Sequence, residues 1–435
     1  MKRIIVLGAG FGGMEAIVEL DRRLRNSSDT ELLLISDQNY FMFTPLLPQI
    51  ASSYIDPRHI VQAVRDIRGR RRFRFRRDTV CEISLDYRRI GLASVPLDYD
   101  YLIIALGSRT DYFGVPGARE NTFDFKSLED AVVLRDRVLD ICEHADHTAE
   151  PAERRRMLTF VIVGGGYTGV ELIAELRDFL FRYVAQRYRG ISRGDIRLVL
   201  LEATQTILSS VHPALRKHAI KRLAAEGIEI RCGARVTRCF DGGVELNGSE
   251  QLPSSTVVWS AGVRAHELVE NLPGRHDRIG RALVNECLQL EGHPEAFVIG
   301  DNAAAATAVD APRVAPVALD QGRLAARNIV HRERSEPLES YRYVSEGMLV
   351  SLGMNDAVVN VLGIRWHGYL AWLFWNAVHL YKLVGFKKQI QVAGDWALGS
   401  LFPRDAAIIR RPQGCKLCGT QCDQTTSPIS RAAKM

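Results

Sequence analysis

Two glycine-rich turns, roughly 155 residues apart, constrain the fold of this 435-residue chain more than any other feature. The first lies in residues 4–20 (IIVLGAGFGGMEAIVEL), and residues 161–176 (VIVGGGYTGVELIAEL) repeat its pattern. Each segment is typical of a β-strand, a tight turn and a helix, and a second apolar run follows each, at 31–36 and 196–202. The pattern therefore predicts two βαβ units, each the beginning of a doubly wound α/β domain.

Both turns keep the spacing G-x-G-x-x-G, with Gly8, Gly10 and Gly13 in the first and Gly164, Gly166 and Gly169 in the second. In this pattern the first glycine makes the turn, the second lets the backbone approach a pyrophosphate, and the third lets the helix pack on the strand. The unpaired N–H groups of the helix N-terminus then bind the phosphates. One such turn is weakly specific, whereas two in the same context predict two dinucleotide sites rather than two structural turns.

The acidic residue that ends the second strand of such a unit binds the ribose hydroxyls. Glu202 holds this position in the second unit, where its charge favours NADH by repelling the 2′-phosphate of NADPH. Asp37 is the candidate in the first unit, although it stands one place later than expected. Two further apolar strands end in glycine, at Gly107 and Gly262, and we expect one of them beside each dinucleotide.

A third apolar strand, EAFVIGDNA (295–303), ends in Gly300 and Asp301. An aspartate in this position reaches the ribityl chain of a flavin, and a helix starting near Asn302 would point at the pyrophosphate. The alternative is that Asp301 only caps that helix. We therefore expect FAD in the domain that contains the first glycine turn, and NADH in the other.

The order of these segments predicts an α/β fold with two Rossmann-like dinucleotide-binding domains, one inserted in the other. The predicted divisions are an FAD-binding domain (1–115 and 290–330), an NADH-binding domain (116–289), a C-terminal region (331–411) and a cysteine-containing tail (412–435).

Composition excludes several other classes of protein. A hydrophobic fraction of 46% and a charged fraction of 25% are typical of a globular chain, and eight cysteines are too few for a disulfide scaffold. The N-terminal apolar run is too short for a signal peptide, and no apolar stretch is long enough to span a membrane, so we expect a cytoplasmic chain. The basic run 65–77 (RDIRGRRRFRFRR) contains an alternation of arginine and phenylalanine, Arg72–Arg76. We interpret this alternation as an exposed strand with inward phenylalanines, not as a nucleic-acid site.

These segments resemble the two-dinucleotide flavoprotein reductases and, more closely, the type II NADH dehydrogenases. The resemblance covers about residues 1–411 and is specific in VLGAGFGG, in NYFMFTPLLPQIAS (39–52), in VIVGGGYTGVELIAEL, in FVIGDNA and in residues 365–396. It implies non-covalent FAD, NADH as substrate and a membrane quinone as acceptor, without proton pumping and without a metal. It also implies a homodimer on the cytoplasmic face of the membrane, and makes Thr44 and Pro45 candidates for contact with FAD.

The resemblance also assigns two residues to quinone chemistry. Glu171 matches a family glutamate implicated in quinone binding and proton transfer, although a glutamate in a first turn also stabilises the helix dipole. The family motif Ala-Gln-x-Ala-x-Gln-Gln-Gly corresponds to residues 315–322 (APVALDQG), where only Gln321 survives. Pro316 and Asp320 replace the other two glutamines, so the identity of the quinone stays open. Gln321 remains the candidate for a polar contact to the acceptor or the flavin.

The segment 366–386 (WHGYLAWLFWNAVHLYKLVGF) is rich in aromatic residues, and its polar members Asn376, His379 and Lys382 recur every three residues. This pattern is typical of an amphipathic helix in a membrane interface, with tryptophan and tyrosine at headgroup depth. A buried core helix and a dimer interface are the alternatives that the residues alone leave open. The resemblance favours docking on a membrane, where the quinone is dissolved.

The tail brings Cys415, Cys418 and Cys422 close together in the sequence. A metal site, a reversible disulfide and an inert tail are all compatible with this spacing, which lacks a fourth ligand. Two other functions also stay open at this point, namely a thiol or sulfide oxidoreductase of the same fold and an NADH-binding redox sensor with low turnover. The thiol function requires cysteines beside the flavin, and only the tail offers a cluster of them.

Overall fold

The computed structural model describes residues 1–305, 311–345, 347–402, 404 and 406–408, which form two compact units. The first unit comprises Met1–Met42, Val61–Arg109 and Val263–Ser345; the second comprises Phe43–Ile60, Thr110–Gly262 and the described part of Glu346–Met435. These limits are not those of the domains predicted from the sequence. The segment 43–60 belongs to the second unit and 263–289 to the first, and the domain division itself stays a prediction.

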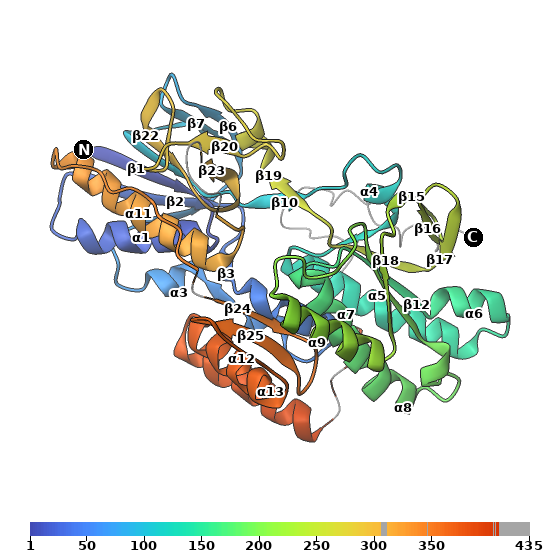
Figure 1. Cartoon of the computed structure of the whole chain (residues 1–435). Helices are drawn as coiled ribbons and strands as arrows, with labels where there is room; N and C mark the ends of the chain where they lie inside the picture. The colour runs from blue at the N-terminus through green and yellow to red at the C-terminus, as the bar shows by residue number, and fades with distance from the viewer. Residues whose placement is uncertain (306–310, 346, 403, 405, 409–435) are drawn as a thin grey trace. The chain divides into compact units, whose positions relative to one another are not determined.

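The first unit is built on an eight-stranded sheet in the order β23-β20-β21-β22-β9-β1-β2-β5 (Figure 1). Parallel pairing joins its central strands, which are β22 (His293–Val298), β9 (Tyr101–Ile104), β1 (Lys2–Leu7), β2 (Thr30–Ser36) and β5 (Arg74–Arg77). Continuous apolar runs form these strands because a parallel sheet is covered on both faces. The other strands of the unit are β3 (Tyr40–Met42), β4 (Val61–Ala63), β6 (Val80–Ser84), β7 (Arg89–Leu92), β8 (Leu97–Asp98), β19 (Val263–Ala265), β20 (Ala282–Val284), β21 (Gln289–Leu290) and β23 (Ala303–Ala305).

The alternating part of the basic run, residues 72–76, lies in and just before β5, whereas the start of the run belongs to α3 (Val64–Arg68). In β5 and just before it, the rings of Phe73 and Phe75 are buried while the guanidinium group of Arg74 is exposed. The prediction of a strand with inward phenylalanines is therefore confirmed.

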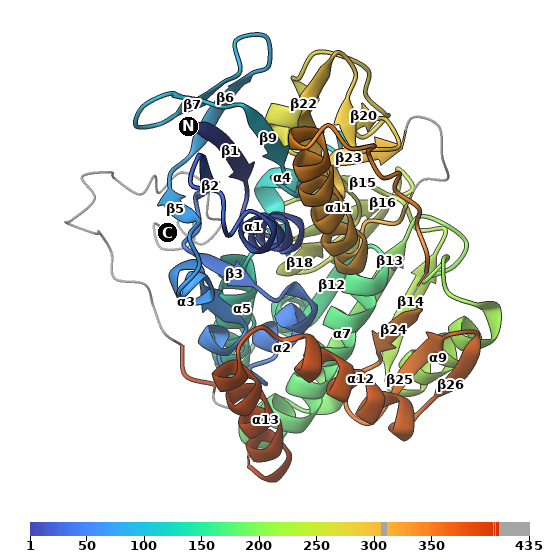
Figure 2. The same cartoon turned by 90° about the vertical axis from the view of Figure 1, so that its left-hand side faces the viewer.

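Two long helices of this unit, α1 (Phe11–Arg23) and α11 (Ala315–Glu333), lie side by side (Figure 2). Glycine makes this close approach possible, because a Cβ atom at Gly322 would lie 2.4 Å from the carbonyl oxygen of Gly12. The shorter helices of the unit are α3 (Val64–Arg68) and α10 (Glu267–Glu270).

The prediction of a helix starting near Asn302 is wrong. Gly300 has a φ of +67°, and a single 3-10 turn (Gly300–Asn302) leads directly into β23, which pairs in parallel with β20. The chain is thus held as a strand after Gly300-Asp301, and the next helix of the described residues, α11, begins at Ala315.

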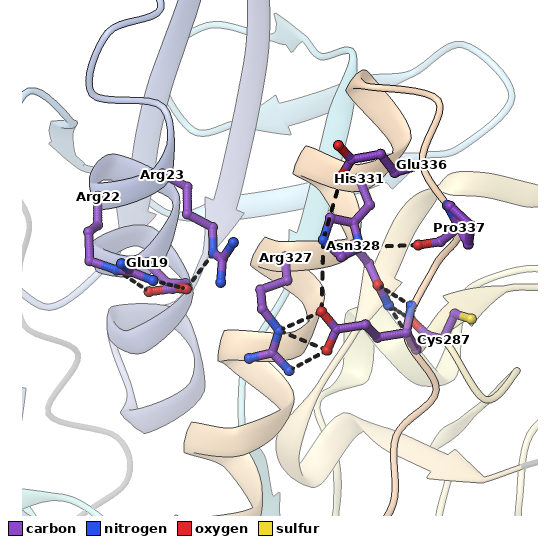
Figure 3. A network of polar contacts seen from close by, with 10 residues as sticks. Glu19, Arg22, Arg23, Cys287, Arg327, Asn328, His331, Glu336 and Pro337 are labelled. Carbon is purple, nitrogen blue, oxygen red and sulfur yellow. Dashed lines mark hydrogen bonds and ion pairs between the residues drawn. The ribbon is translucent and has the colours of Figure 1, made fainter.

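A polar network fixes the segment after α11 onto that helix (Figure 3). The Asn328 side-chain amide donates to the carbonyl oxygens of Glu339 and Cys287 at 2.9 and 3.2 Å, and its oxygen accepts from the Glu339 N–H at 2.8 Å. Arg327 pairs with the Glu339 carboxylate, with N–O distances of 2.9–3.1 Å. Because Asn328 is buried, these hydrogen bonds satisfy a side chain that would otherwise be costly to bury.

The second unit has its own parallel sheet, in the order β11-β18-β12-β13-β14. Its strands are β11 (Phe123–Asp124), β18 (Thr256–Trp259), β12 (Thr159–Val163), β13 (Arg197–Glu202) and β14 (Ile228–Cys232). A separate antiparallel sheet contains β15 (Val236–Phe240), β16 (Gly243–Leu246) and β17 (Glu250–Pro253), and packs into the same apolar core. The helices up to residue 225 are α2 (Leu47–Ala51), α4 (Ala118–Asn121), α5 (Leu128–His147), α6 (Pro151–Met157), α7 (Tyr167–Phe179), α8 (Ala185–Arg187) and α9 (Pro213–Ala225), with a π-helical turn at Leu180–Val184.

The C-terminal part of the second unit is an antiparallel sheet, β24 (Met348–Ser351), β25 (Ala357–Val361) and β26 (Ile364–His367), followed by two helices. The prediction of a single helix over 366–386 is therefore wrong. Two glycines with positive φ, Gly368 at +88° and Gly385 at +94°, divide it. Trp366 belongs to β26, α12 runs from Tyr369 to Lys382, and α13 runs from Phe386 to Leu401.

None of the helices in the described ranges has the length and apolar composition needed to cross a bilayer. The predicted cysteine cluster, Cys415, Cys418 and Cys422, lies outside the described residues.

Two helical glycines give opposite predictions for stability. Gly322→Ala should lower the free energy of unfolding by about 1–3 kcal/mol, since its methyl group would overlap the Gly12 carbonyl oxygen. Gly394→Ala in α13 should raise it by roughly 0.5–1 kcal/mol, because no atom lies within 4 Å of the new methyl group and alanine is the better helix former. Urea denaturation of both variants measures the two signs. Equal effects would contradict the close approach of α1 and α11.

Candidate functional site

The first glycine turn has the geometry of a phosphate-binding loop. Gly8 has a φ of +98°, and a Cβ atom at Gly13 would lie 1.9 Å from the Gly8 carbonyl oxygen, so both positions require glycine. At Gly10, by contrast, an added Cβ atom would have no neighbouring atom within 4 Å. No side chain caps the N-terminus of α1, which starts directly after Gly10. The turn therefore leaves room for a group with negative charge at the positive end of the helix.

The second turn repeats this geometry in the second unit. Gly164 has a φ of +110°, and a Cβ atom at Gly169 would lie 1.9 Å from the Gly164 carbonyl oxygen. Gly166 again has nothing within 4 Å of a built Cβ atom, and no side chain caps α7. Corresponding glycines therefore have the same roles in both turns: the first has a positive φ, the second leaves open space, and the third contacts the carbonyl oxygen of the first.

Glu202, at the end of β13, lies against the second turn. Its carboxylate accepts hydrogen bonds from the backbone N–H groups of Gly165 and Thr204, both at 2.8 Å. The carboxylate is therefore held next to the loop that would bind phosphates, where a ribose would follow. Asp37, its predicted counterpart after β2, is exposed, and Arg77 donates to its backbone oxygen at 2.9 Å.

The Gly300-Asp301 turn is bound to α11 and to the strand that follows β9. The Gly300 N–H donates to the Gln321 side-chain oxygen at 2.7 Å, which holds the buried Gln321 side chain in place. The Ser108 hydroxyl donates to the Asp301 carboxylate. The buried amide nitrogen of Asn302 has no hydrogen-bond partner among the described residues.

The remaining predicted cofactor residues occupy turns. Gly107 has a φ of +74° and open space around a built Cβ atom, while a Cβ atom at Gly262 would lie 2.3 Å from the Phe113 ring. Thr44 and Pro45 begin a 3-10 turn (Thr44–Leu46) that leads into α2 in the second unit, and Thr44 is exposed. Open space at Gly10 and Gly107, the uncapped α1 and the Asn302 amide nitrogen, which has no hydrogen-bond partner among the described residues, together fit a bound dinucleotide such as FAD.

Glu171 lies in α7, in the turn that follows the second glycine loop. Its Oε1 accepts a hydrogen bond from the Ser351 N–H of β24 at 2.9 Å. Burial, partly offset by this hydrogen bond, raises the pKa of Glu171 to about 8. At neutral pH this carboxyl is therefore protonated and can donate a proton. A surface glutamate in a first turn, the alternative that the sequence left open, would not have this environment.

A second carboxyl group on α7, Glu175, and three residues that interact with it were not identified from the sequence. Glu175 lies one turn further along α7, Ser52 and Gln49 come from α2 and its end, and Arg404 follows α13; all four side chains are buried. Only Glu175 had a local signal, since ELIAEL places it four residues after Glu171 on the same face of the helix. The others come from segments more than 100 residues away in the sequence.

Pro316 and Asp320, which replace two glutamines of the family motif, take structural positions in α11. Pro316 lies in the first turn of the helix, where it has no N–H to leave unpaired. Arg323 binds the exposed Asp320 at 3.0 Å and Glu15 at 2.6 Å. Gln321 alone of the three motif positions lies buried against the Gly300 turn.

His379, on α12, is bound within the protein. Its Nδ1 lies 2.7 Å from the Trp375 carbonyl oxygen, and its ring stacks on that of Trp375 with 3.9 Å between centroids. Burial lowers the pKa of His379 to about 4, so the ring is neutral at neutral pH.

Comparison with known proteins decides the family. Residues 2–322 match the pyridine nucleotide-disulphide oxidoreductases, and residues 346–405 match the NDH2 C-terminal domain. A type II NADH:quinone oxidoreductase of Mycobacterium tuberculosis is 31% identical over 92% of this chain and 89% of its own. The chain belongs to the type II NADH:quinone oxidoreductases. It is an enzyme that uses FAD to oxidise NADH and reduce a quinone, as the sequence resemblance implied.

Other relatives agree. A type II NADH:quinone oxidoreductase of Staphylococcus epidermidis is 29% identical over 83% of this chain and 90% of its own. The NDH2 of Plasmodium falciparum, solved in complex with NADH, has a TM-score of 0.86 over 93% of this chain and 99% of its own, at 20% identity. A sulfide:quinone oxidoreductase of Aquifex aeolicus shares the fold with a TM-score of 0.72 over 92% and 95% of the two chains, at 20% identity. Enzymes of the NDH2 family are peripheral membrane enzymes.

The position of Glu202 predicts the choice of nucleotide. Glu202→Arg should shift the ratio of kcat/KM values for NADH and NADPH towards NADPH by roughly 10- to 100-fold, because a repulsion is replaced by a charge-assisted hydrogen bond to the 2′-phosphate. Glu202→Gln is the matched control, since it keeps an acceptor for the Gly165 and Thr204 N–H groups without adding a cation. Unchanged selectivity in Glu202→Arg would refute the ribose assignment.

Proposed function

We propose that Glu171 donates a proton to the quinone in this NADH:quinone oxidoreductase. Reduction of a quinone by two electrons requires two protons, and one proton per turnover comes from water because NADH brings a hydride. When bound, FAD supplies the electron transfer between the two substrates. The contribution of the chain is to hold the nucleotides, and to deliver a proton from a group that is protonated at neutral pH. The place of Glu171 carries this proposal: it follows the second glycine turn on α7 and is held by the Ser351 N–H at 2.9 Å, in surroundings that raise its pKa.

We also assign the binding residues on the geometry of the two turns. NADH would be held with its phosphates at Gly164, Gly166 and Gly169 and its ribose on Glu202, beside Gly262. FAD would be held by turn residues of the first unit, which are Gly8, Gly10, Gly13, Asp37, Gly107, Gly300 and Asp301. For Thr44 and Pro45, which belong to the second unit, contact with FAD stays a prediction from the resemblance. Gln321 would then set the position of the Gly300 turn through its hydrogen bond to the Gly300 N–H.

The cysteines in the described part of the chain do not favour a reaction that uses a thiol as nucleophile. Burial raises the pKa of Cys142 and of Cys239 to about 12, and it also raises the pKa values of Cys232 and Cys287. A thiol that attacks a disulfide needs a lowered pKa. The quinone reductase is therefore the better-supported function.

Glu171→Gln tests the proton donor. We expect quinone reduction to slow by roughly 100-fold or more, the usual contribution of a general acid, while flavin reduction by NADH stays within a few-fold of wild type. In the wild-type enzyme, quinone reduction should fall as the pH rises through about 8, because deprotonation of Glu171 removes the donor. Stopped-flow absorbance separates the two half-reactions. Equal slowing of both would place Glu171 outside the proton path.

We further propose that α12 and α13 dock on the cytoplasmic face of the membrane. The two helices lie side by side (Figure 1) and expose large apolar side chains that would be costly in water. These exposed residues are Tyr369, Leu370, Leu373, Phe374, Tyr381, Phe386, Ile390, Leu398, Leu401 and Phe402. Lys387, also exposed, supplies a cation for anionic headgroups. The surface thus extends beyond residues 366–386 into α13. The homodimer implied by the resemblance stays part of this proposal.

A double variant tests docking. Leu370→Glu with Phe386→Glu should reduce binding to anionic phospholipid vesicles at least 10-fold, since two apolar side chains, 72% and 76% exposed, are replaced by charges. Tyr87→Glu is the matched control, because Tyr87 is 82% exposed but belongs to the first unit. Vesicle flotation measures the bound fraction. Undiminished flotation of the double variant would contradict docking through these helices.

A further inference from the structure

Glu175 is a buried carboxyl group to which the proposed function gives no role. It lies one helical turn after Glu171 on α7 and is only 4% exposed. Its Oε2 lies 3.0 Å from the Ser52 hydroxyl and 3.7 Å from the Arg404 guanidinium group. A buried carboxyl must be either neutral or paired, because an isolated charge is very costly in the interior. The surroundings of Glu175 allow both states, because burial favours the neutral carboxyl and Arg404 can pair with the ionised one.

The Ser52 hydroxyl is a hydrogen-bond donor within reach of the Glu175 carboxyl group. Its oxygen lies 3.2 Å from the Gln49 carbonyl oxygen and 3.0 Å from the Glu175 carboxyl. A hydroxyl has one proton and can donate it to only one of these acceptors at a time. The Ser52 hydroxyl can donate to the Glu175 Oε2 or to the Gln49 carbonyl oxygen. Donation to the carboxylate stabilises the ionised form of Glu175.

Arg404 offers the charge that stabilises the ionised form. It donates to the Ser52 carbonyl oxygen at 3.0 Å, and its guanidinium group lies 4.5 Å from the centre of the Tyr54 ring. Because Arg404 is itself buried, solvent screens its attraction for Glu175 only weakly. The same four-residue cluster of Ser52, Tyr54, Glu175 and Arg404 therefore accommodates the carboxyl with its proton and without it.

The other titratable groups near Glu175 have their own partners. On α7, Glu171 binds the Ser351 N–H, and Asp178 pairs with Arg177 and Arg182. From the end of α2, Tyr54 faces the same space, where burial raises its pKa to about 12. Burial raises the pKa of Glu175, while Arg404, Ser52 and Gln49 oppose that rise. Two carboxyl groups one turn apart repel when both are ionised, so they titrate as a coupled pair.

We propose that Glu175 is a positioning residue that stores a second proton and returns it to Glu171 after each turnover. This inference rests on the proposed role of Glu171 as the proton donor. In the first step the Glu171 carboxyl gives its proton to the singly protonated quinol anion, which leaves quinol and an ionised Glu171. In the second step the Glu175 carboxyl transfers its proton to Glu171, and Arg404 stabilises the charge left on Glu175. A proton from water then restores Glu175.

The test is an infrared titration of the carboxyl C=O band in the FAD-loaded, full-length enzyme. In wild type, the second of the two protons on Glu171 and Glu175 is lost against the repulsion of the first carboxylate. In Glu175→Gln that repulsion is gone, so we expect the highest carboxyl midpoint to lie roughly one pH unit lower than in wild type. The alkaline limit of quinone reduction should move to lower pH by the same amount. Glu291→Gln, which changes a glutamate with a 77% exposed side chain in the first unit, is the control and should move neither midpoint.

Arg404→Gln provides a second variant with the opposite sign, and it keeps the inference testable if Glu175→Gln does not fold. Removal of the cation should move the last carboxyl midpoint to higher pH, since the ionised Glu175 loses its stabilising charge. Damage to packing alone would not move the two midpoints in opposite directions.

The outcomes separate the two proposals. If the carboxyl midpoints are unchanged in Glu175→Gln and Arg404→Gln, Glu175 does not store a proton for Glu171. The proposal that Glu171 donates a proton to the quinone would still stand. If instead Glu171→Gln slows flavin reduction and quinone reduction equally, the donor itself is refuted, whatever the titration of Glu175 shows.

Discussion

In both nucleotide turns, a backbone carbonyl oxygen occupies the space that a side chain would need. The Gly8 oxygen excludes any Cβ atom at position 13, and the Gly164 oxygen excludes one at position 169. This contact presses the first turn of the helix against the end of the strand, so the N-terminal N–H groups face the open space beside Gly10 or Gly166. The proposed places of both dinucleotides depend on these two contacts.

In the proposed mechanism, one helix, α7, joins the binding of the nucleotide to the transfer of protons. Its N-terminus begins at the second glycine turn, its next turn carries Glu171, and Glu175 follows one turn later. The positive end of the helix suits phosphates, while the interior of the helix suits neutral carboxyl groups because it is buried. Because they belong to one rigid helix, the second glycine turn, Glu171 and Glu175 are held at fixed distances from one another.

The sequence predicted the features that are encoded locally. Strand, turn and helix around Gly8 and Gly164 were identified correctly because glycine spacing and apolar runs report on the immediate backbone. The helix expected near Asn302 failed because pairing of β23 with β20 holds that stretch as a strand, which local residues do not reveal. Similarly, the aromatic pattern of 366–386 gave no sign that Trp366 pairs within a sheet. The cluster around Glu175 depends on Ser52 and Arg404, which lie 123 and more than 200 residues away, so only the folded chain brings it together.

The arginines of β5 have a consequence for the behaviour of the protein in crowded solution. This strand is the last of the eight-stranded sheet, so one side of its backbone lacks a neighbouring strand in that sheet. Such an edge can recruit a strand from another molecule and begin aggregation. Arg74 and Arg76 of this strand pair with Glu31 and Asp78, and the exposed Arg77 donates to the Asp37 carbonyl oxygen. Charged side chains on an edge strand disfavour pairing with a second copy, so this cationic stretch makes the edge a poor template for aggregation.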